Sequence, residues 1–159
     1  MMNDSFVNKG MVYIMIIRKP ERDELKLIES LTLQAFSEAN QSDIKLIEEP
    51  IKGVSKELYD NGAEYFIALE NGEVLGWIFL GKNVDAIYNQ TFGFIYELFV
   101  LPEFRNRGIA TKLMEFSFEH FKNKDILQVK LNVHKDNTAK KLYDKLGFNE
   151  INISMNKTL

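Results

Sequence analysis

Residues 92–133 constrain the fold more than any other part of the sequence. Residues 92–101 are rich in β-branched and aromatic side chains, and the run ends at Pro102, which has no N–H to donate to a sheet. Residues 108–121 then carry apolar side chains at helical spacing, and residues 127–133 alternate between apolar and polar as a strand does. Two strands joined by one helix lie parallel through a right-handed crossover. We therefore expect a parallel strand pair in this chain.

The same two periodicities predict the remaining elements. Strands are expected over residues 13–18, 64–70, 74–80 and 148–156, and helices over residues 21–39, 42–60 and 137–146. Asn71-Gly72, between two of these strands, is a strong β-hairpin signal. Pro50 and Gly53 are expected to break the second helix, and Gly147 suits a helix C-terminal cap. The order β-α-α-β-β-β-α-β-α-β does not alternate strictly, which excludes Rossmann and TIM-barrel folds and favours an α/β fold of the α+β kind.

No linker, repeat or low-complexity segment divides the 159 residues, so we expect a single domain over residues 13–159. Residues 1–12 are expected to form a flexible N-terminal extension. The native start stays open among four methionines, Met1, Met2, Met11 and Met15. The apolar stretch 11–17 is short and is followed by charged residues instead of a small-residue cleavage site, so it does not indicate a signal peptide. A cytoplasmic location is expected.

Charge and composition exclude several classes of function. Twenty Lys and Arg against 23 Asp and Glu give a net charge of −3, which does not favour a nucleic-acid or membrane-surface partner. The absence of cysteine excludes disulfides, thiolate zinc sites and Cys nucleophiles. With two histidines and no H-E-x-x-H motif, no catalytic metal is expected. No apolar run approaches the roughly 18 residues that a membrane span needs.

The turn between Arg105 and Thr111 leads straight into the helix expected over residues 108–121. The backbone amides of a helix's first turn lack intrahelical acceptors and, with the positive end of the helix dipole, form an anion site. Gly108 lets the backbone approach a ligand closely, and the neighbouring arginines add positive charge. A diphosphate is the natural occupant. The alternative is a capped helix start with solvated arginines.

Two motifs together resemble the GCN5-related N-acetyltransferase (GNAT) superfamily. The first is Val100-Leu101-Pro102-Glu103-Phe104-Arg105-Asn106-Arg107-Gly108-Ile109-Ala110, which is similar to the family pattern V-x-P-x-x-R/Q-x-x-G-x-G/A. The second is Asn137-Thr138-Ala139-Lys140-Lys141-Leu142-Tyr143-Asp144-Lys145-Leu146-Gly147-Phe148, with one residue fewer between Asn and Ala than in some members. The resemblance implies a GNAT-like fold: a twisted, mostly antiparallel mixed sheet of about six or seven strands, flanked by about four helices, with the parallel strand-helix-strand crossover at the cofactor site.

The resemblance also implies acetyl-CoA as co-substrate and assigns the residues that would bind it. The strand backbone would pair with the pantetheine arm, the turn amides would hold the pyrophosphate, and Asn137 would contact the pantetheine or its surroundings. The implied cofactor-binding residues are Leu98, Phe99, Val100, Arg105, Asn106, Arg107, Gly108, Ile109, Ala110, Thr111 and Asn137.

Tyr143 and Glu97 are the catalytic candidates. The resemblance places Tyr143 near the thioester sulfur, where a phenol of pKa about 10 can protonate a departing thiolate; the alternative is a core aromatic on its helix face. An alkyl amine of pKa near 10.4 is neutral in only about one molecule in two thousand at pH 7, so a base is useful. Glu97 precedes the cofactor-pairing backbone and is the candidate base, directly or through water. The alternative is a strand glutamate paired with a Lys or Arg.

One departure from the family concerns the strand over residues 127–133. Several N-terminal acetyltransferases of the family carry a glutamate base where this sequence has Asn132, and an asparagine cannot act as that base. This disfavours acetylation of protein N-termini. His134 could titrate near neutrality, but a solvated loop residue is the favoured interpretation.

The sequence thus favours an N-acetyltransferase that transfers acetyl to a primary amine by direct attack in a ternary complex, since no cysteine can carry the acetyl group. We expect a small molecule or a peptide as acceptor, and the resemblance implies that residues 30–60 and 82–92 line its pocket. A non-catalytic acyl-CoA-binding sensor or scaffold is the alternative function. A homodimer stays open.

Overall fold

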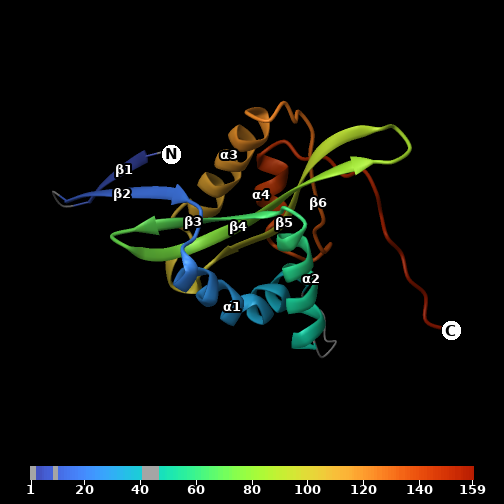
Figure 1. Ribbon diagram of the computed structural model, residues 1–159, viewed down its shortest axis with the longest axis horizontal. Helices are drawn as coiled ribbons and strands as arrows, with labels where there is room; N and C mark the ends of the chain where they lie inside the picture. Colours follow the sequence, from blue (N-terminus) through green and yellow to red (C-terminus); the bar gives the residue numbers. More distant parts are fainter. Residues whose placement is uncertain (1–2, 9–10, 41–46) are drawn as a thin grey trace.

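The computed structural model describes residues 3–8, 11–40 and 47–159 (Figure 1). In these residues six strands and four helices follow one another, with a short 3-10 turn before the third helix. The strands are β1 Asn3–Asn8, β2 Met11–Arg18, β3 Glu64–Glu70, β4 Glu73–Asp85, β5 Gln90–Val100 and β6 Val129–Leu131. The helices are α1 Arg22–Asn40, α2 Glu48–Asp60, α3 Ile109–Lys122 and α4 Lys140–Lys145, and the 3-10 turn is Pro102–Phe104.

The strands form one sheet in the order of the sequence, from β1 to β6. Every neighbouring pair is antiparallel except β5 and β6, which run parallel with Gly93 opposite Val129 and Ile95 opposite Leu131. α3 connects these two strands and forms the crossover. The predicted mixed, mostly antiparallel sheet with flanking helices and one parallel crossover is confirmed.

Each face of the sheet carries its own hydrophobic cluster. α1 and α2 lie on one face and α3 and α4 on the other (Figure 1). On β4, Trp77 and Phe79 belong to the cluster with α1, whereas Ile78 and Leu80 belong to the cluster with Leu113 of α3. Alternate residues of a strand face opposite sides, so β4 is buried on both. Burying each of these side chains stabilises the fold by about 1.5–3 kcal/mol.

A β-bulge at Tyr96 interrupts the pairing of β4 with β5. Phe79 lies opposite Glu97 and Leu80 opposite Ile95, so Tyr96 is the extra residue. The bulge places two consecutive side chains on the α1 face, because Tyr96 packs on Phe79 while Glu97 bonds to Trp77. Gly81 lies beneath the Tyr96 ring, where an added Cβ would come within 2.4 Å.

Several elements are shorter than predicted. The predicted helix over residues 42–60 begins at Glu48, and residues 42–46 lie outside the described residues. It continues through Pro50 and Gly53, which corrects the predicted break. Proline is tolerated there because a first-turn N–H has no helical acceptor. The strand over 127–133 is reduced to β6, and the helix over 137–146 to α4. Across the described ranges no helix is long and apolar enough to cross a membrane.

Residues 3–8 form β1, where the sequence predicts a flexible extension. β1 pairs antiparallel with β2, from Asn3 opposite Ile16 to Asn8 opposite Met11. Without β1, β2 would be an edge strand with a row of unpaired backbone groups. The pairing therefore extends the sheet beyond the predicted domain start at residue 13.

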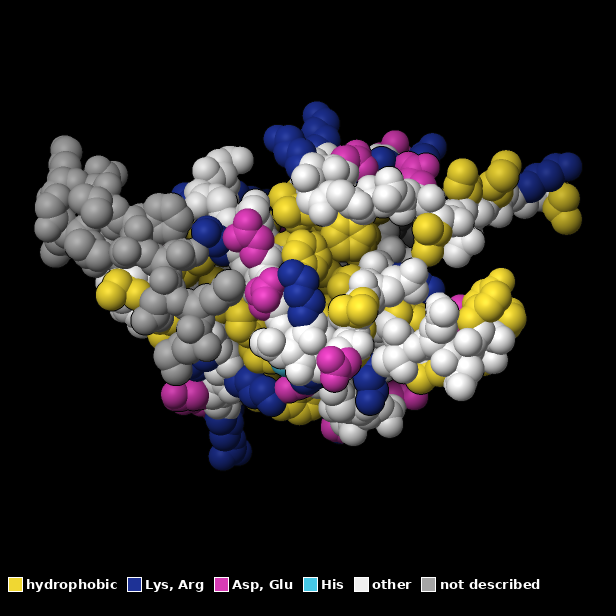
Figure 2. All heavy atoms as spheres, turned by 90° about the horizontal axis from the view of Figure 1, so that it is seen from above, with side chains coloured by type: hydrophobic (Ala, Val, Ile, Leu, Met, Phe, Trp, Pro, Cys, Tyr) yellow, Lys and Arg dark blue, Asp and Glu magenta, His cyan; other side chains and the backbone are white. Residues whose placement is uncertain are grey.

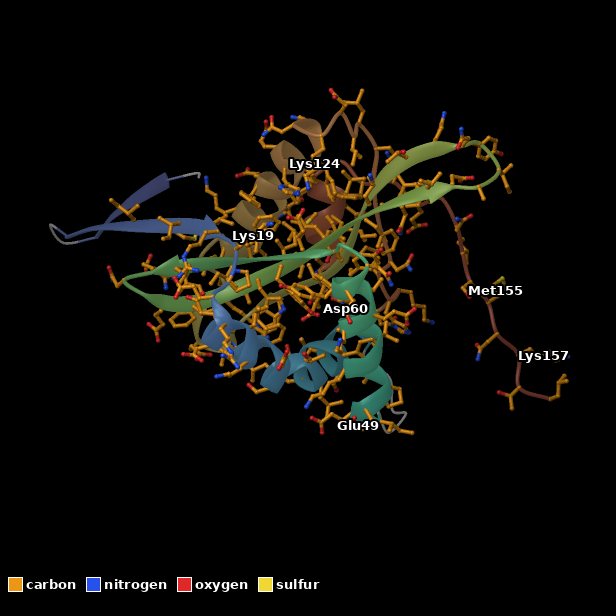
Figure 3. All side chains as sticks on the ribbon, viewed as in Figure 1. Lys19, Glu49, Asp60, Lys124, Met155 and Lys157 are labelled. Carbon is orange, nitrogen blue, oxygen red and sulfur yellow. The ribbon has the colours of Figure 1, made fainter. Side chains whose placement is uncertain are left out.

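The C-terminal segment differs most from its prediction. Residues 148–156 have no regular secondary structure, so the strand predicted there is wrong. Ile151, Ile153 and Met155 alternate with polar residues but are 67%, 79% and 89% exposed. Alternation yields a strand only where a neighbour takes up the backbone hydrogen bonds, and no strand of the described part of the chain does so. Figure 3 shows Met155 and Lys157 on a tail that leaves the body. In Figure 2, hydrophobic side chains lie on two projections at the end of the molecule where Figure 1 places this tail and the β4–β5 hairpin.

Candidate active site

The turn that follows β5 exposes the first amides of α3. Gly108 is the residue before the helix and has φ +78°, and no side chain caps this end. Lys112 donates its N–H to the Gly108 carbonyl at 3.1 Å, so the amides of Ile109, Ala110 and Thr111 have no intrahelical acceptor. A Cβ added at Gly108 would meet no atom within 4 Å. A side chain added at Gly108 would therefore project into open space.

The two arginines of the turn are bound within the protein. Arg105 donates Nε–H to the Val100 carbonyl at 2.9 Å and Nη2–H to Glu38 Oε2 at 2.5 Å. Arg107 donates Nη2–H to Glu70 Oε2 at 2.7 Å. These contacts fix the turn against α1 and β3. The backbone amides, more than the arginine side chains, are left available to a diphosphate.

β5 and β6 pair only over Gly93–Ile95 and Val129–Leu131 and then separate. Leu101 donates its N–H to Leu75 on β4 at 3.0 Å. Successive strand residues direct their backbone groups to opposite edges. The backbone groups of Val100 and Leu98 therefore point away from β4, whereas those of Phe99 point toward it. Of the three strand residues that the resemblance assigns to pantetheine, Leu98 can offer it both backbone groups and Val100 its N–H, because the Val100 carbonyl accepts from Arg105.

Asn137 holds the segment after β6 to the end of α1. Its Nδ2–H donates to the Ala39 carbonyl at 2.8 Å, and its Oδ1 accepts the Ala139 N–H at 2.8 Å. Arg105, on the β5 side, reaches the adjacent Glu38. The last turn of α1 thus contacts both sides of the separated strand pair.

Glu97 lies on the α1 face of β5 and is partly buried. Its Oε1 accepts the indole N–H of Trp77 at 2.6 Å. Burial raises the pKa of Glu97 to about 7, and the Trp77 hydrogen bond opposes this rise. The stacked rings of Tyr65 and Phe79, 3.9 Å apart, lie on the same face. Among the described residues no Lys or Arg forms an ion pair with Glu97. The alternative prediction, a strand glutamate paired with a Lys or Arg, therefore does not describe this residue, whose partner is Trp77.

Tyr143 lies on α4 and packs in the α3 cluster. Its ring meets Phe148 edge-on at 5.9 Å, and burial raises the pKa of its phenol. Glu97 belongs to the opposite face of the sheet. The fold does not bring the two catalytic candidates into contact; they lie on either side of the β5 edge that carries Leu98 and Val100.

The segment after β6 holds the two residues that depart from or complicate the family pattern. Asn132 is exposed, and His134 is an exposed loop residue whose Nδ1 accepts the Asp136 N–H at 3.4 Å. Within the part of the chain that the structure describes, no group of three or more His, Asp or Glu side chains could hold a metal ion.

Sequence reasoning did not single out Trp77 or Ala39, and it considered Glu38 only as a charge near the acceptor, not as the partner of Arg105. Trp77 is the single tryptophan and lies in a predicted strand, which is a signal for a special position. Its contact with Glu97, however, depends on a register that the bulge at Tyr96 shifts.

The family model described as "Acetyltransferase (GNAT) family" matches residues 25–148. The chain belongs to this family. The match begins within α1, ends three residues after α4, and includes the turn before α3, Glu97 and Tyr143.

Two curated relatives carry acetyltransferase names. The chain is similar to an uncharacterized N-acetyltransferase of Bacillus subtilis, YdgE, with 27% identity over 86% of this chain and 93% of that protein. It is also similar to N-alpha-acetyltransferase 30 of Schizosaccharomyces pombe, with 33% identity over 52% of this chain. The chain spans little more than half, 55%, of that second relative.

Solved structures share the fold. A putative acetyl transferase from Pyrococcus furiosus superposes with a TM-score of 0.74 at 22% identity, covering 91% of this chain and 99% of that one. A predicted acetyltransferase from Clostridium acetobutylicum, solved with acetyl-CoA, has a TM-score of 0.68 at 21% identity and covers 91% and 96%. The chain therefore shares the fold of these two acetyltransferase structures, one of which was solved with acetyl-CoA.

Proposed function

We propose that this protein is an acetyl-CoA-dependent N-acetyltransferase that transfers acetyl to a primary amine by direct attack in a ternary complex. One observation carries the proposal. On β5 the partly buried Glu97, whose carboxylate accepts the Trp77 N–H, directly precedes the outward-facing backbone of Leu98 and the outward-facing N–H of Val100. A base and a cofactor-pairing edge on consecutive residues would hold both reactants together.

Acetyl-CoA would bind along the β5 edge and the turn. The backbone groups of Leu98 and the N–H of Val100 would pair with the pantetheine amides, and the free amides of Ile109, Ala110 and Thr111 would hold the diphosphate. The ion pairs of Arg105 and Arg107 would keep the turn in place.

Glu97 would take the proton that the amine must lose. The neutral amine nitrogen then attacks the thioester carbonyl, a C–N bond forms, and the C–S bond breaks to release the CoA thiolate, while the second proton of the former ammonium group passes to solvent as the amide forms. A carboxyl of pKa about 7 is largely ionised slightly above neutrality and is a stronger base than an ordinary carboxylate. Tyr143, whose phenol pKa burial raises, would donate a proton to the thiolate. The acceptor would enter from the α1 and α2 face, where Glu97 lies.

A thiol-release assay tests the proposal. The protein, acetyl-CoA and a panel of polyamines, aminoglycosides, amino acids and peptides should give CoA release that depends on the amine. Binding of acetyl-CoA without release for any amine would instead support the non-catalytic sensor. Absence of binding would reject both functions.

A matched pair of variants at Gly108 tests the diphosphate site. Asn tolerates a positive φ better than other non-glycine residues, and Asp has the same shape with a negative charge. Gly108→Asn should retain most of the acetyl-CoA affinity, while Gly108→Asp should weaken it more than tenfold by calorimetry, since a carboxylate would face the phosphates. Wild-type affinity in both variants would remove the diphosphate from this turn.

A further inference from the structure

Trp77 makes the one side-chain hydrogen bond to Glu97 that the described structure contains. The indole Nε1–H donates to Glu97 Oε1 at 2.6 Å, and Trp77 is 0% exposed. The two residues are on neighbouring strands but are not directly opposite, since Trp77 faces Phe99 and Glu97 faces Phe79. The bond therefore runs diagonally across the two strands.

An indole differs from other hydrogen-bond donors in its charge and in the number of N–H groups that it offers a carboxylate. It is neutral and has a single N–H, with no acceptor that could compete for a proton. It stabilises the ionised carboxylate by one hydrogen bond without supplying a positive charge. Because it engages Oε1 alone, Oε2 has no partner among the described side chains.

The surrounding rings lock the indole in place. The Phe99 ring lies 4.7 Å from Trp77 and is itself covered by the Arg105 guanidinium at 5.5 Å. Arg105 in turn bonds to Glu38 of α1. The direction of the indole N–H is thus fixed by packing that extends from β4 to α1.

We propose that Trp77 is the positioning residue of the active site: it fixes Oε1 of Glu97 and so presents Oε2 to the proton of the acceptor amine. The inference rests on the proposed function, because it takes Glu97 as the base. The hydrogen bond between Trp77 and Glu97 is independent of that function.

Among the other titratable groups on this side of the sheet, Tyr65 of β3 interacts with Glu97: burial, then the charge of Glu97, raises the pKa of its phenol. Tyr96 of β5 donates to Asn83, Tyr59 of α2 packs on Tyr65 at 6.1 Å, and Glu29 of α1 acts on Tyr65. Burial raises the pKa of Glu97 and the Trp77 hydrogen bond lowers it, so these two effects set its ionisation near neutrality.

The test removes a single N–H. Because Trp77 is the only tryptophan, a tryptophan-auxotrophic strain fed β-(3-benzothienyl)alanine would replace it alone by a nearly isosteric side chain with sulfur in place of N–H. A hydrogen bond to a charged group corresponds to about one to two pKa units. The rising limb of kcat/KM against pH should therefore move up by that amount, with a loss of roughly five- to fiftyfold at pH 7. The loss should shrink at higher pH, and the Kd for acetyl-CoA should stay within about twofold.

The same replacement in Glu97→Gln is the control. No limb remains there for Trp77 to move, so the replacement should not change the pH profile further. An unchanged limb in the wild-type background, or an equal loss in Glu97→Gln, would overturn the positioning role.

A titration without catalysis separates the two proposals. The carboxyl carbon shift of Glu97, followed by NMR with and without the indole N–H, should show the same upward displacement even if Glu97→Gln leaves acetylation intact. In that case the base assignment fails while the Trp77 contact stands. An undisplaced midpoint overturns the Trp77 role whatever the activity.

Discussion

Glu64 and Glu97 are both partly buried strand glutamates, yet their pKa values move in opposite directions. Glu64 begins β3, and Lys19 and Lys124 each reach its carboxylate at 2.6 Å, with His120 at 3.3 Å. Figure 3 labels the two lysines, which follow β2 and α3. Burial by itself raises the pKa of Glu64, but the lysines outweigh it and lower the pKa to about 2. At Glu97, burial prevails and the pKa rises to about 7.

The difference lies in the partners. Two ammonium groups keep Glu64 ionised near neutrality, and the ion pairs connect β3 to Lys19 after β2 and to Lys124 after α3. A neutral indole holds Glu97 in place and leaves its proton exchangeable near neutrality. Perturbed carboxyls occur both in structural ion pairs and in active sites. Here the charge of the partner tells the two apart.

The largest expected effect separates the glutamates by activity. Glu97→Gln keeps the shape and can still accept the Trp77 N–H, but cannot take a proton. We expect kcat/KM to fall by about 10²–10⁴ near pH 7, with the defect shrinking as pH rises and free amine becomes abundant. Glu64→Gln, the matched control, should stay within about twofold in steady-state kinetics. A defect in Glu97→Gln that is equal at all pH values would assign Glu97 to binding or structure.

Tyr143, the proposed general acid, differs from both glutamates in that its hydroxyl has no hydrogen-bond partner among the described residues. Its ring packs on Phe148. Tyr143→Phe should lower kcat by about ten- to a hundredfold, at or below the usual range for a general acid because a thiolate leaves readily. The Kd for acetyl-CoA should change by no more than a few-fold, and stability by about 1 kcal/mol or less. Wild-type kcat in the Phe variant, with a large loss of melting temperature only in Tyr143→Ala, would establish a core aromatic instead.

Much of the fold could be predicted because its signals are local in sequence. The hairpin at Asn71-Gly72, the strand that stops at Pro102 and the glycine turn before α3 are each specified by a few neighbouring residues. Two motifs of this kind are enough to indicate the family, and the resemblance they carry also makes Glu97 and Tyr143 candidates.

The contacts that define the site could not be predicted because they are remote. Arg105 meets Glu38 across 67 positions, and Asn137 meets Ala39 across 98. The Trp77 contact with Glu97 depends on the register of β4 and β5, which the bulge at Tyr96 sets. The strand predicted over residues 148–156 is wrong for a related reason. Alternation indicates which side chains a strand would bury, but not whether a sheet edge is available to pair with it.

The stability of Glu97→Gln should reveal the cost of keeping a carboxylate beside aromatic rings. Because the folded pKa lies above the unfolded value of about 4.5, the folded state binds more protons between pH 4.5 and 7, and wild-type stability falls as pH rises through that window. The glutamine variant lacks this loss. It should unfold with a free energy about 3 kcal/mol larger than wild type at pH 8 and nearly equal at pH 4, measured by denaturant titration. A variant less stable than wild type at pH 8 would mean that the carboxylate is stabilised where it lies.

Glu64→Gln should give the opposite pH dependence and the smallest effect. The folded pKa of Glu64, about 2, lies below the unfolded value, so its contribution is complete above pH 4.5 and is lost as pH falls toward 2. Lys19 and Lys124 are 66% and 48% exposed, and solvent screens their attraction. The variant should therefore lose about 1 kcal/mol of unfolding free energy at pH 7, and the gap from wild type should close as the pH is lowered from 4.5. The two glutamine variants would thus diverge from wild type in opposite directions above pH 7. If Glu64→Gln were instead stabilising at neutral pH, burial would outweigh the lysines, and the two carboxyls would differ in function but not in electrostatic environment.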